Sequence, residues 1–298
     1  YYLGFVMRKI VALGGGHGLS MLLRVLNTFD IDLTGIVNVV DDGGSSGRIR
    51  EDIEITSPGD VRLCALALSS DSNDYGSAFR DIFSFRFDKG ELDGHSLGNL
   101  ILVALTRQLG SFEKAVEKAS ELLEVKGKVL PASVSDVVLC ANTKNGLVRG
   151  QVNVENSSEI QKVFLDPIDI KPLDGVIDSI NNADQIFYAP GSLFSSVLPS
   201  LLIEDINKAL WNSKASITMI LNLTNKGPDT YNMTGDDQLK VILDHGARVD
   251  SVLCDNNSLT VTKPPKGCKV QLAKIGSSID VHDESLLAEY LKDEYGFN

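Results

Sequence analysis

Cysteine is scarce in this sequence of 298 residues, and the four that occur, Cys64, Cys140, Cys254 and Cys268, lie far apart in the chain. None forms a C-x-x-C pair or a set with the spacing of metal ligands. Because closely spaced cysteines are the mark of disulfide-rich secreted domains, their absence favours a cytoplasmic protein with reduced, mostly buried thiols. The sequence alone does not exclude one disulfide between two of the four cysteines.

Long apolar runs are also missing. No stretch approaches the ~20 consecutive apolar residues that cross a bilayer, and no charged segment followed by an apolar one opens the chain as a signal peptide would. We therefore expect no membrane span. Residues 1–6 do not resemble a natural start, so we expect tag or vector residues there and the natural start at Met7.

Basic residues are outnumbered, with 28 Lys and Arg against 40 Asp and Glu and a formal net charge of −12. Nucleic-acid binding needs Lys and Arg to replace the counterions of phosphate, so this balance argues against such a partner. A small anion remains a possible ligand, because a local nest of backbone amides is electropositive even in an acidic protein. The chain has no repeat, low-complexity tract or long linker, which favours a single domain over residues 7–298.

A burst of glycines follows the first apolar run, Ile10 to Leu13. The apolar run predicts a strand, the glycines predict a tight turn, and the apolar segment 21–26 predicts a helix. The free amides at the start of such a helix can bind an anion. The spacing G-x-G-x-G has no glycine at position 19, so the dinucleotide fingerprint is not met and NAD or FAD is disfavoured. A purely structural turn is the alternative. The candidate phosphate-binding residues here are Gly14, Gly15, Gly16, His17, Gly18 and Ser20.

An acidic, glycine-rich loop follows the second predicted strand, residues 33–40. Carboxylates at this place can bind a ribose hydroxyl, and they are also ligands for Mg²⁺, the one cofactor that the sequence leaves open. Nearby arginines either clamp phosphate or neutralise the acidic residues, and Asp60 is placed to cap a helix. The candidates are Asp41, Asp42, Gly43, Gly44, Ser45, Ser46, Arg48, Asp60 and Arg62, with Asp41 and Asp42 as candidate metal ligands.

Apolar residues at helical spacing predict helices from Ala78 to about Lys128, interrupted by a polar segment that contains His95, Ser96 and Asn99. This segment is richer in polar groups than a helix cap needs, so we include all three as ligand-binding candidates. His95 is the one candidate for acid–base catalysis. In the alternative interpretation Ser96 caps the helix and His95 is a solvated turn residue.

The rest of the chain alternates between strand and helix patterns. Residues 137–141 and 147–152 predict an antiparallel hairpin, and strands are predicted at 217–223, 249–254 and 270–273, with a closing helix at 284–294. A strand ending at residue 189 leads into a second candidate anion site, which consists of Pro190, Gly191, Ser192 and Ser195. Three such turns after strands predict one crevice at the carboxyl edge of a mostly parallel α/β sheet.

Five motifs in order resemble the YvcK family, within the CofD-like superfamily. They are residues 14–20, 41–48, 58–62, 94–99 and 190–193. The resemblance implies a three-layer α/β/α fold of Rossmann character with a helical segment. It also implies a gluconeogenesis factor that binds UDP-sugars, notably UDP-N-acetylglucosamine, and influences carbon metabolism, the cell wall and cell shape. CofD enzymes of the same superfamily transfer a phospholactyl group to a deazaflavin, using a divalent cation.

The sequence departs from the family pattern in its last third. Ala189 stands where the family usually has Gly, 228–230 where Gly-Glu-Thr is expected, and Asp237-Gln238 where Asp-His is expected. Ligand contacts near residues 226–238 are therefore left undefined. Two functions stay open: a regulatory protein that binds a nucleotide-sugar, which we prefer, and a Mg²⁺-dependent transferase of the phospholactate type. Either is compatible with a homo-oligomer.

Overall fold

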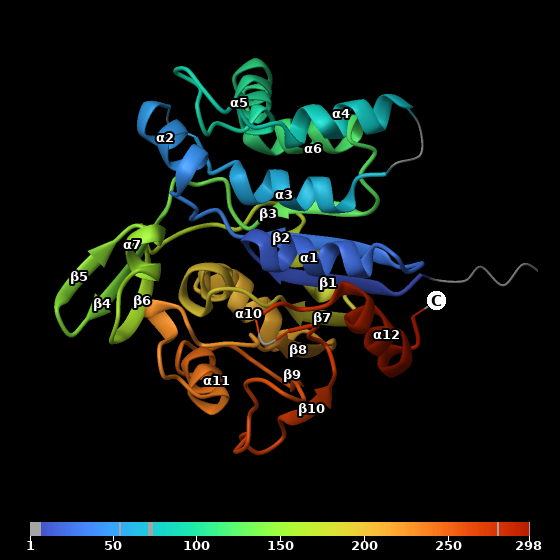
Figure 1. Ribbon diagram of the computed structural model, residues 1–298, viewed down its shortest axis with the longest axis vertical. Coiled ribbons are helices and arrows are strands. Elements are labelled where there is room, and N and C mark those ends of the chain that lie inside the picture. The colour runs from blue at the N-terminus through green and yellow to red at the C-terminus, as the bar shows by residue number, and fades with distance from the viewer. Residues whose placement is uncertain (1–6, 54, 71–73, 279, 298) are drawn as a thin grey trace, which may run out of the picture.

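A parallel β-sheet of seven strands forms the centre of the molecule (Figure 1). The computed structural model describes residues 7–53, 55–70, 74–278 and 280–297. In spatial order the strands are β10 (Lys269–Ala273), β9 (Ser251–Asp255), β8 (Ser216–Ile220), β7 (Gln185–Tyr188), β1 (Lys9–Gly14), β2 (Asp32–Val37) and β3 (Lys128–Pro131). Each of them pairs in parallel with its neighbours.

The order of the strands reverses at β1. Strands β2 and β3 continue the sheet on one side of β1, whereas β7, the next strand of this sheet in the chain, pairs on the other side. Ligands of open α/β sheets bind at such a switch point, in the crevice outside the carboxyl ends of the strands. The turns that follow β1 and β7 are therefore the first place to look for a site.

Helices cover both faces of the sheet. Side chains of a strand alternate between the faces, so Ile10 and Ala12 contribute to one hydrophobic core and Val11 and Leu13 to the other. The first face carries α1 (Gly16–Leu26), α2 (Gly44–Asp52), α3 (Gly59–Leu68), α4 (Asp74–Ser84), α5 (Leu97–Leu109), α6 (Phe112–Leu122) and α12 (Glu284–Tyr295). The second carries α8 (Val176–Asn181), η1 (Leu193–Val197), α9 (Leu198–Leu201), α10 (Glu204–Asn212) and α11 (Gly235–Asp244). This confirms the three-layer arrangement.

A small antiparallel sheet lies to the left of the large one in Figure 1. It consists of β4 (Val138–Thr143) between β5 (Gly146–Arg149) and β6 (Ile160–Asp166), with α7 (Gln151–Glu155) joining β5 to β6. Its buried residues Leu139, Val163 and Leu165 extend the core of the second face. The predicted hairpin is confirmed, and β6 is a third strand that the sequence pattern did not single out.

Three local predictions need correction. Strand β2 ends at Val37 rather than at residue 40, and residues 44–52 form helix α2 rather than a loop. Asp60 does not cap its helix, because α3 begins at Gly59 after Pro58, and the Asp60 carboxylate accepts the backbone amide of Gly16 instead.

The free thiols are confirmed for all four cysteines. Within the described ranges, no helix has the length and apolar character needed to cross a membrane.

Candidate functional site

The turn between β1 and α1 is built from glycines that other elements approach closely. Gly16 has a φ of +58°, which favours glycine, and a β-carbon added there would meet only an Asp60 oxygen, at 3.8 Å. A β-carbon at Gly15 would lie 1.9 Å from the Asn38 amide nitrogen, and one at Gly18 would lie 1.7 Å from the Pro190 carbonyl oxygen. The first turn of α1 is thus packed directly against the turn that follows β7.

The turn after β7 is fixed by one side chain that follows β8. The Asn222 carboxamide accepts the Gly191 amide at 2.8 Å and donates to the Gly191 carbonyl at 2.6 Å. Ser192 donates its hydroxyl to Asp229 at 2.9 Å and accepts the amide of Ser195 at 3.4 Å. The next residues form η1, a single π-helical turn of a type often found at functional sites. Within the described chain, the buried hydroxyl of Ser195 has no hydrogen-bond partner.

A cavity of about 720 Å³ opens beside this turn. Its walls come from the turn after β7, the segment after β8, the end of α7, the segment around η2 (Pro228–Thr230) and the region before α12. The lining residues are Glu155, Asn156, Gly191, Ser192, Asn222, Leu223, Thr224, Lys226, Gly227, Pro228, Asp229, Thr230, Asp280 and His282. We call this cavity the crevice. Lys226 pairs with Asp280 at 2.7 Å, and both side chains are largely exposed.

Acidic side chains with raised pKa values surround the crevice and the β1–α1 turn. Burial and the neighbouring Asp41 raise the pKa of Asp60 to about 7. Burial, followed by the charge of Asp229, raises the pKa of Glu155, and burial raises that of Asp229. Because carboxylates accept hydrogen bonds from hydroxyl groups, this wall suits a ligand that presents hydroxyls.

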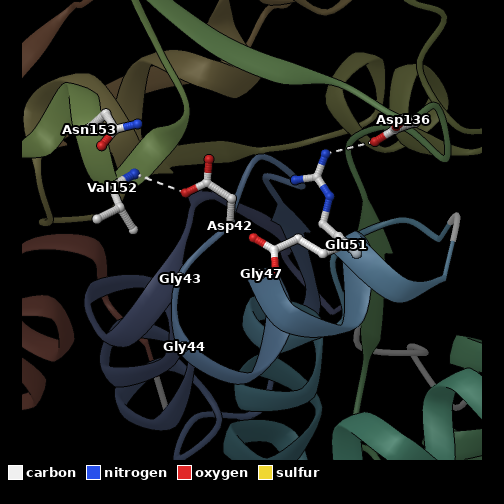
Figure 2. Close-up of a pocket in the computed structure, with 9 residues that line it drawn as sticks. Asp42, Gly43, Gly44, Gly47, Glu51, Asp136, Val152 and Asn153 are labelled. Atoms are coloured by element: carbon white, nitrogen blue, oxygen red, sulfur yellow. Dashed lines mark hydrogen bonds and ion pairs between the residues drawn. The ribbon is translucent and has the colours of Figure 1, made fainter.

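The two acidic residues after β2 point in different directions. Asp42 accepts the Gln151 and Val152 amides, at 2.7 and 2.9 Å, and so caps the start of α7 (Figure 2). Asp41 accepts the amide of Gly43 and the hydroxyl of Ser57. No group of three or more His, Cys, Asp or Glu side chains in the described residues is arranged to hold a metal ion. Both oxygens of Asp42 are occupied by amides of α7, so a metal role for this pair stays a prediction, and we derive no step through Mg²⁺.

A separate polar network joins α2 to α5. The hydroxyl of Ser45 contacts Nδ1 of His95 at 3.2 Å and accepts the Asn99 side-chain amide at 3.1 Å. Asn99 in turn accepts Nε of the buried Arg62 at 2.9 Å. Burial lowers the pKa of Arg62 to about 10, and burial and nearby arginines lower the pKa of His95. Ser96 occupies the cap position of α5, but its hydroxyl makes no cap bond and lacks a partner among the described residues.

The remaining predicted residues have simple surroundings. His17 is exposed, whereas the buried Ser20 returns its hydroxyl to the His17 carbonyl. Arg48 donates to the Asp93 carbonyl, and Ser46 lies against Gly59. The structure therefore brings together three groups. One lies around the turns after β1 and β7. A second, Asp42, Gly43 and Gly44, lines a separate cavity beside α7 (Figure 2). The third lies around Ser45, His95 and Asn99, none of which is among the residues that line the crevice.

Sequence reasoning missed several residues of the crevice and its neighbourhood. Asn38 and Asn222 each follow the apolar end of a parallel strand, and a polar residue at that position was a usable signal. Asn38 donates to the Ser196 carbonyl at 3.1 Å, which ties the end of β2 to η1. Glu155 and Asp229 had no such signal, because α7 and η2 reach the crevice only through the tertiary fold.

Fold and site together define an α/β protein with a Rossmann-like sheet and a polar crevice at its switch point. A family model described as 2-phospho-L-lactate transferase CofD matches residues 10–282. The gluconeogenesis factor of Bacillus subtilis is 42% identical, over 84% of this chain and 80% of its own length. That of Halalkalibacterium halodurans is 40% identical, over 88% of this chain and 82% of its own length.

A longer relative and a solved structure agree with this match. A Clostridium acetobutylicum relative is 41% identical over 85% of this chain but only 57% of its own length, so the chain spans little more than half of that protein. A crystal structure of a UPF0052-family protein from Bacillus halodurans aligns with a TM-score of 0.88 and 34% identity, covering 97% of this chain and 99% of that one. The chain belongs to the CofD family and, within it, to the gluconeogenesis factors of the YvcK type.

Proposed function

We propose that this chain is a cytoplasmic regulatory protein of carbon metabolism and of cell-wall and cell-shape control, and that it binds a nucleotide-sugar of the UDP-N-acetylglucosamine kind in the crevice. The observation that carries the proposal is the Gly191 peptide. Asn222 holds it in the wall of the crevice, and Gly18 packs against the neighbouring Pro190. The turn after β7 thus lines a ligand-sized space, and the first turn of α1 lies directly against that turn.

The two kinds of groups around this space match the two kinds of groups in a nucleotide-sugar. The first amides of α1 lack acceptors within the helix and sit at its positive end, which suits a diphosphate. Carboxylates such as Glu155 and Asp229 suit the hydroxyls of the ribose and the sugar. A ligand with phosphates alone would leave the acidic wall facing like charge.

A ligand screen by thermal shift tests the proposal. We expect UDP-sugars to raise the melting temperature more than dinucleotides or deazaflavin precursors do, because binding to the native state alone stabilises it. Each compound is measured with magnesium and again with EDTA, which also tests whether Asp41 or Asp42 needs a metal. The proposal is contradicted if only dinucleotides raise the melting temperature, or if none of the nucleotide-sugars raises it.

The family match favours a second candidate, a transferase of the phospholactate type. It predicts multiple turnover when the protein is incubated with the deazaflavin Fo and an activated phospholactate donor, with products identified by mass spectrometry. If His95 is a general base, His95→Ala lowers that turnover by a factor of ~10²–10⁴ with little change in affinity. We expect binding without turnover instead, because His95 is bonded to Ser45 and lies outside the crevice lining.

A further inference from the structure

A second cavity adjoins the crevice. It has a volume of about 530 Å³, and both cavities are lined by Pro228 and Asp229. A second segment also runs from one to the other, since Asn156 lines the crevice and residues 158–160 line the second cavity. Because two segments of the chain contribute to both cavities, we treat the two as successive parts of one groove. The second cavity is its outer part, which extends toward α11.

The outer part differs from the crevice in chemistry. Apolar side chains in its lining are Phe194, Ile160, Met233, Val241 and Pro228. Its charged side chains already have partners. Glu159 pairs with Lys144, and Lys240 pairs with Asp244. Asp237 accepts the amide and hydroxyl of Thr234, and Asp229 accepts the hydroxyl of Ser192. This part of the groove therefore offers apolar surface rather than free charge.

Two exposed side chains lie in the same lining. Tyr231 is 69% exposed although it carries a large aromatic ring. Asn232 is also exposed and has a φ of +63°, in the left-handed region. Neither the Tyr231 hydroxyl nor the Asn232 carboxamide makes a hydrogen bond with another residue in the described part of the chain. An aromatic face and a free carboxamide thus stand together at an apolar cavity.

We propose that the outer cavity binds the nucleobase of the nucleotide ligand, with Tyr231 as the stacking platform and the Asn232 carboxamide pairing with the edge of the base. The proposal rests on the proposed function and adds the orientation of the ligand, with its base in the outer cavity and its sugar and phosphates in the crevice. Every base has a π face that stacks on an aromatic ring. A pyrimidine edge presents an acceptor beside a donor, and a carboxamide satisfies both. The sugar and phosphates then occupy the crevice.

Calorimetric titration of purified variants tests this subsite. The probes are UDP-N-acetylglucosamine and N-acetylglucosamine 1-phosphate, which lacks the nucleoside. We expect Tyr231→Ala to weaken UDP-N-acetylglucosamine binding about tenfold or more, through loss of stacking. Tyr231→Phe keeps the ring and should bind like the wild type. Phe85→Ala, which removes a 49% exposed aromatic ring outside both linings, is the matched control and should change neither affinity.

The outcomes separate the two levels of the proposal. Selective weakening of the nucleotide-sugar by Tyr231→Ala, with unchanged affinity for the sugar phosphate, supports the subsite. Wild-type affinity in Tyr231→Ala, or equal weakening of both probes, overturns the subsite and leaves the proposed function standing. A wild-type protein that binds no UDP-N-acetylglucosamine overturns both.

Discussion

At the scale of the residue, Asp60 links the site to pH. Its pKa rises from an ordinary 3.8 to about 7 on folding, so between these values the folded protein holds a proton that the unfolded chain has released. The contribution of this bound proton to the free energy of unfolding is complete below pH ~4 and is lost as the pH rises toward 7. Asp60→Asn keeps an acceptor for the Gly16 amide without the titration.

We therefore expect the free energy of unfolding of Asp60→Asn, relative to that of the wild type, to increase by roughly 1 kcal/mol or more between pH 5 and pH 8. Urea denaturation of both proteins at the two pH values measures this difference. A difference that does not change with pH would show that Asp60 titrates normally.

Two glycines of the β1–α1 turn should respond differently to alanine. At Gly16 the positive φ costs roughly 1–2 kcal/mol, but the added methyl has room and projects beside Asp60, so we expect a folded protein with lost ligand binding. At Gly18 the methyl would overlap the Pro190 carbonyl, and the strain should cost roughly 1–3 kcal/mol or more. Thermal melts and ligand titrations of both variants check this. Unchanged affinity in a folded Gly16→Ala would refute the phosphate role of the turn.

At the scale of the element, Asp42 couples the end of β2 to α7. Its carboxylate accepts two amides at the start of that short helix, so Asp42→Ala should lower the free energy of unfolding by about 1 kcal/mol. Asp42→Asn retains one acceptor oxygen and should lose less. Denaturant titration gives both values. If both variants unfold like the wild type but bind ligand poorly, the carboxylate acts on the ligand instead.

Elements with a strong local pattern were predictable. The glycine turn after β1 and the hairpin of β4 and β5 each carry a sequence signal that tertiary contacts did not override. Helix α2 was not predictable, since its first residues are glycine and serine, and tertiary contacts hold it: Ile49 packs into the core and Ser45 accepts hydrogen bonds from Ser96 and Asn99. The polar segment around His95 joins a network with Ser45 that only the tertiary fold creates, and the ligand role of its residues stays a prediction.

At the scale of the whole molecule, we propose that the described chain unfolds as one domain. The cores on the two faces meet through alternate residues of the same strands, and Leu139 and Val163 of the small sheet belong to one of these cores. A cooperative unit of this kind should show one calorimetric transition with equal calorimetric and van't Hoff enthalpies. Separate melting of the small sheet would contradict the proposal.

The central claim is that a nucleotide-sugar lies in the crevice at the switch point of the sheet. Hydrogen–deuterium exchange with and without UDP-N-acetylglucosamine tests it most directly, because bound ligand slows the exchange of the amides that it contacts or orders. We expect protection in segments 14–20, 189–196 and 222–233, and unchanged exchange in the turn between β4 and β5. Protection confined to other segments, or no protection at saturating ligand, would contradict the account.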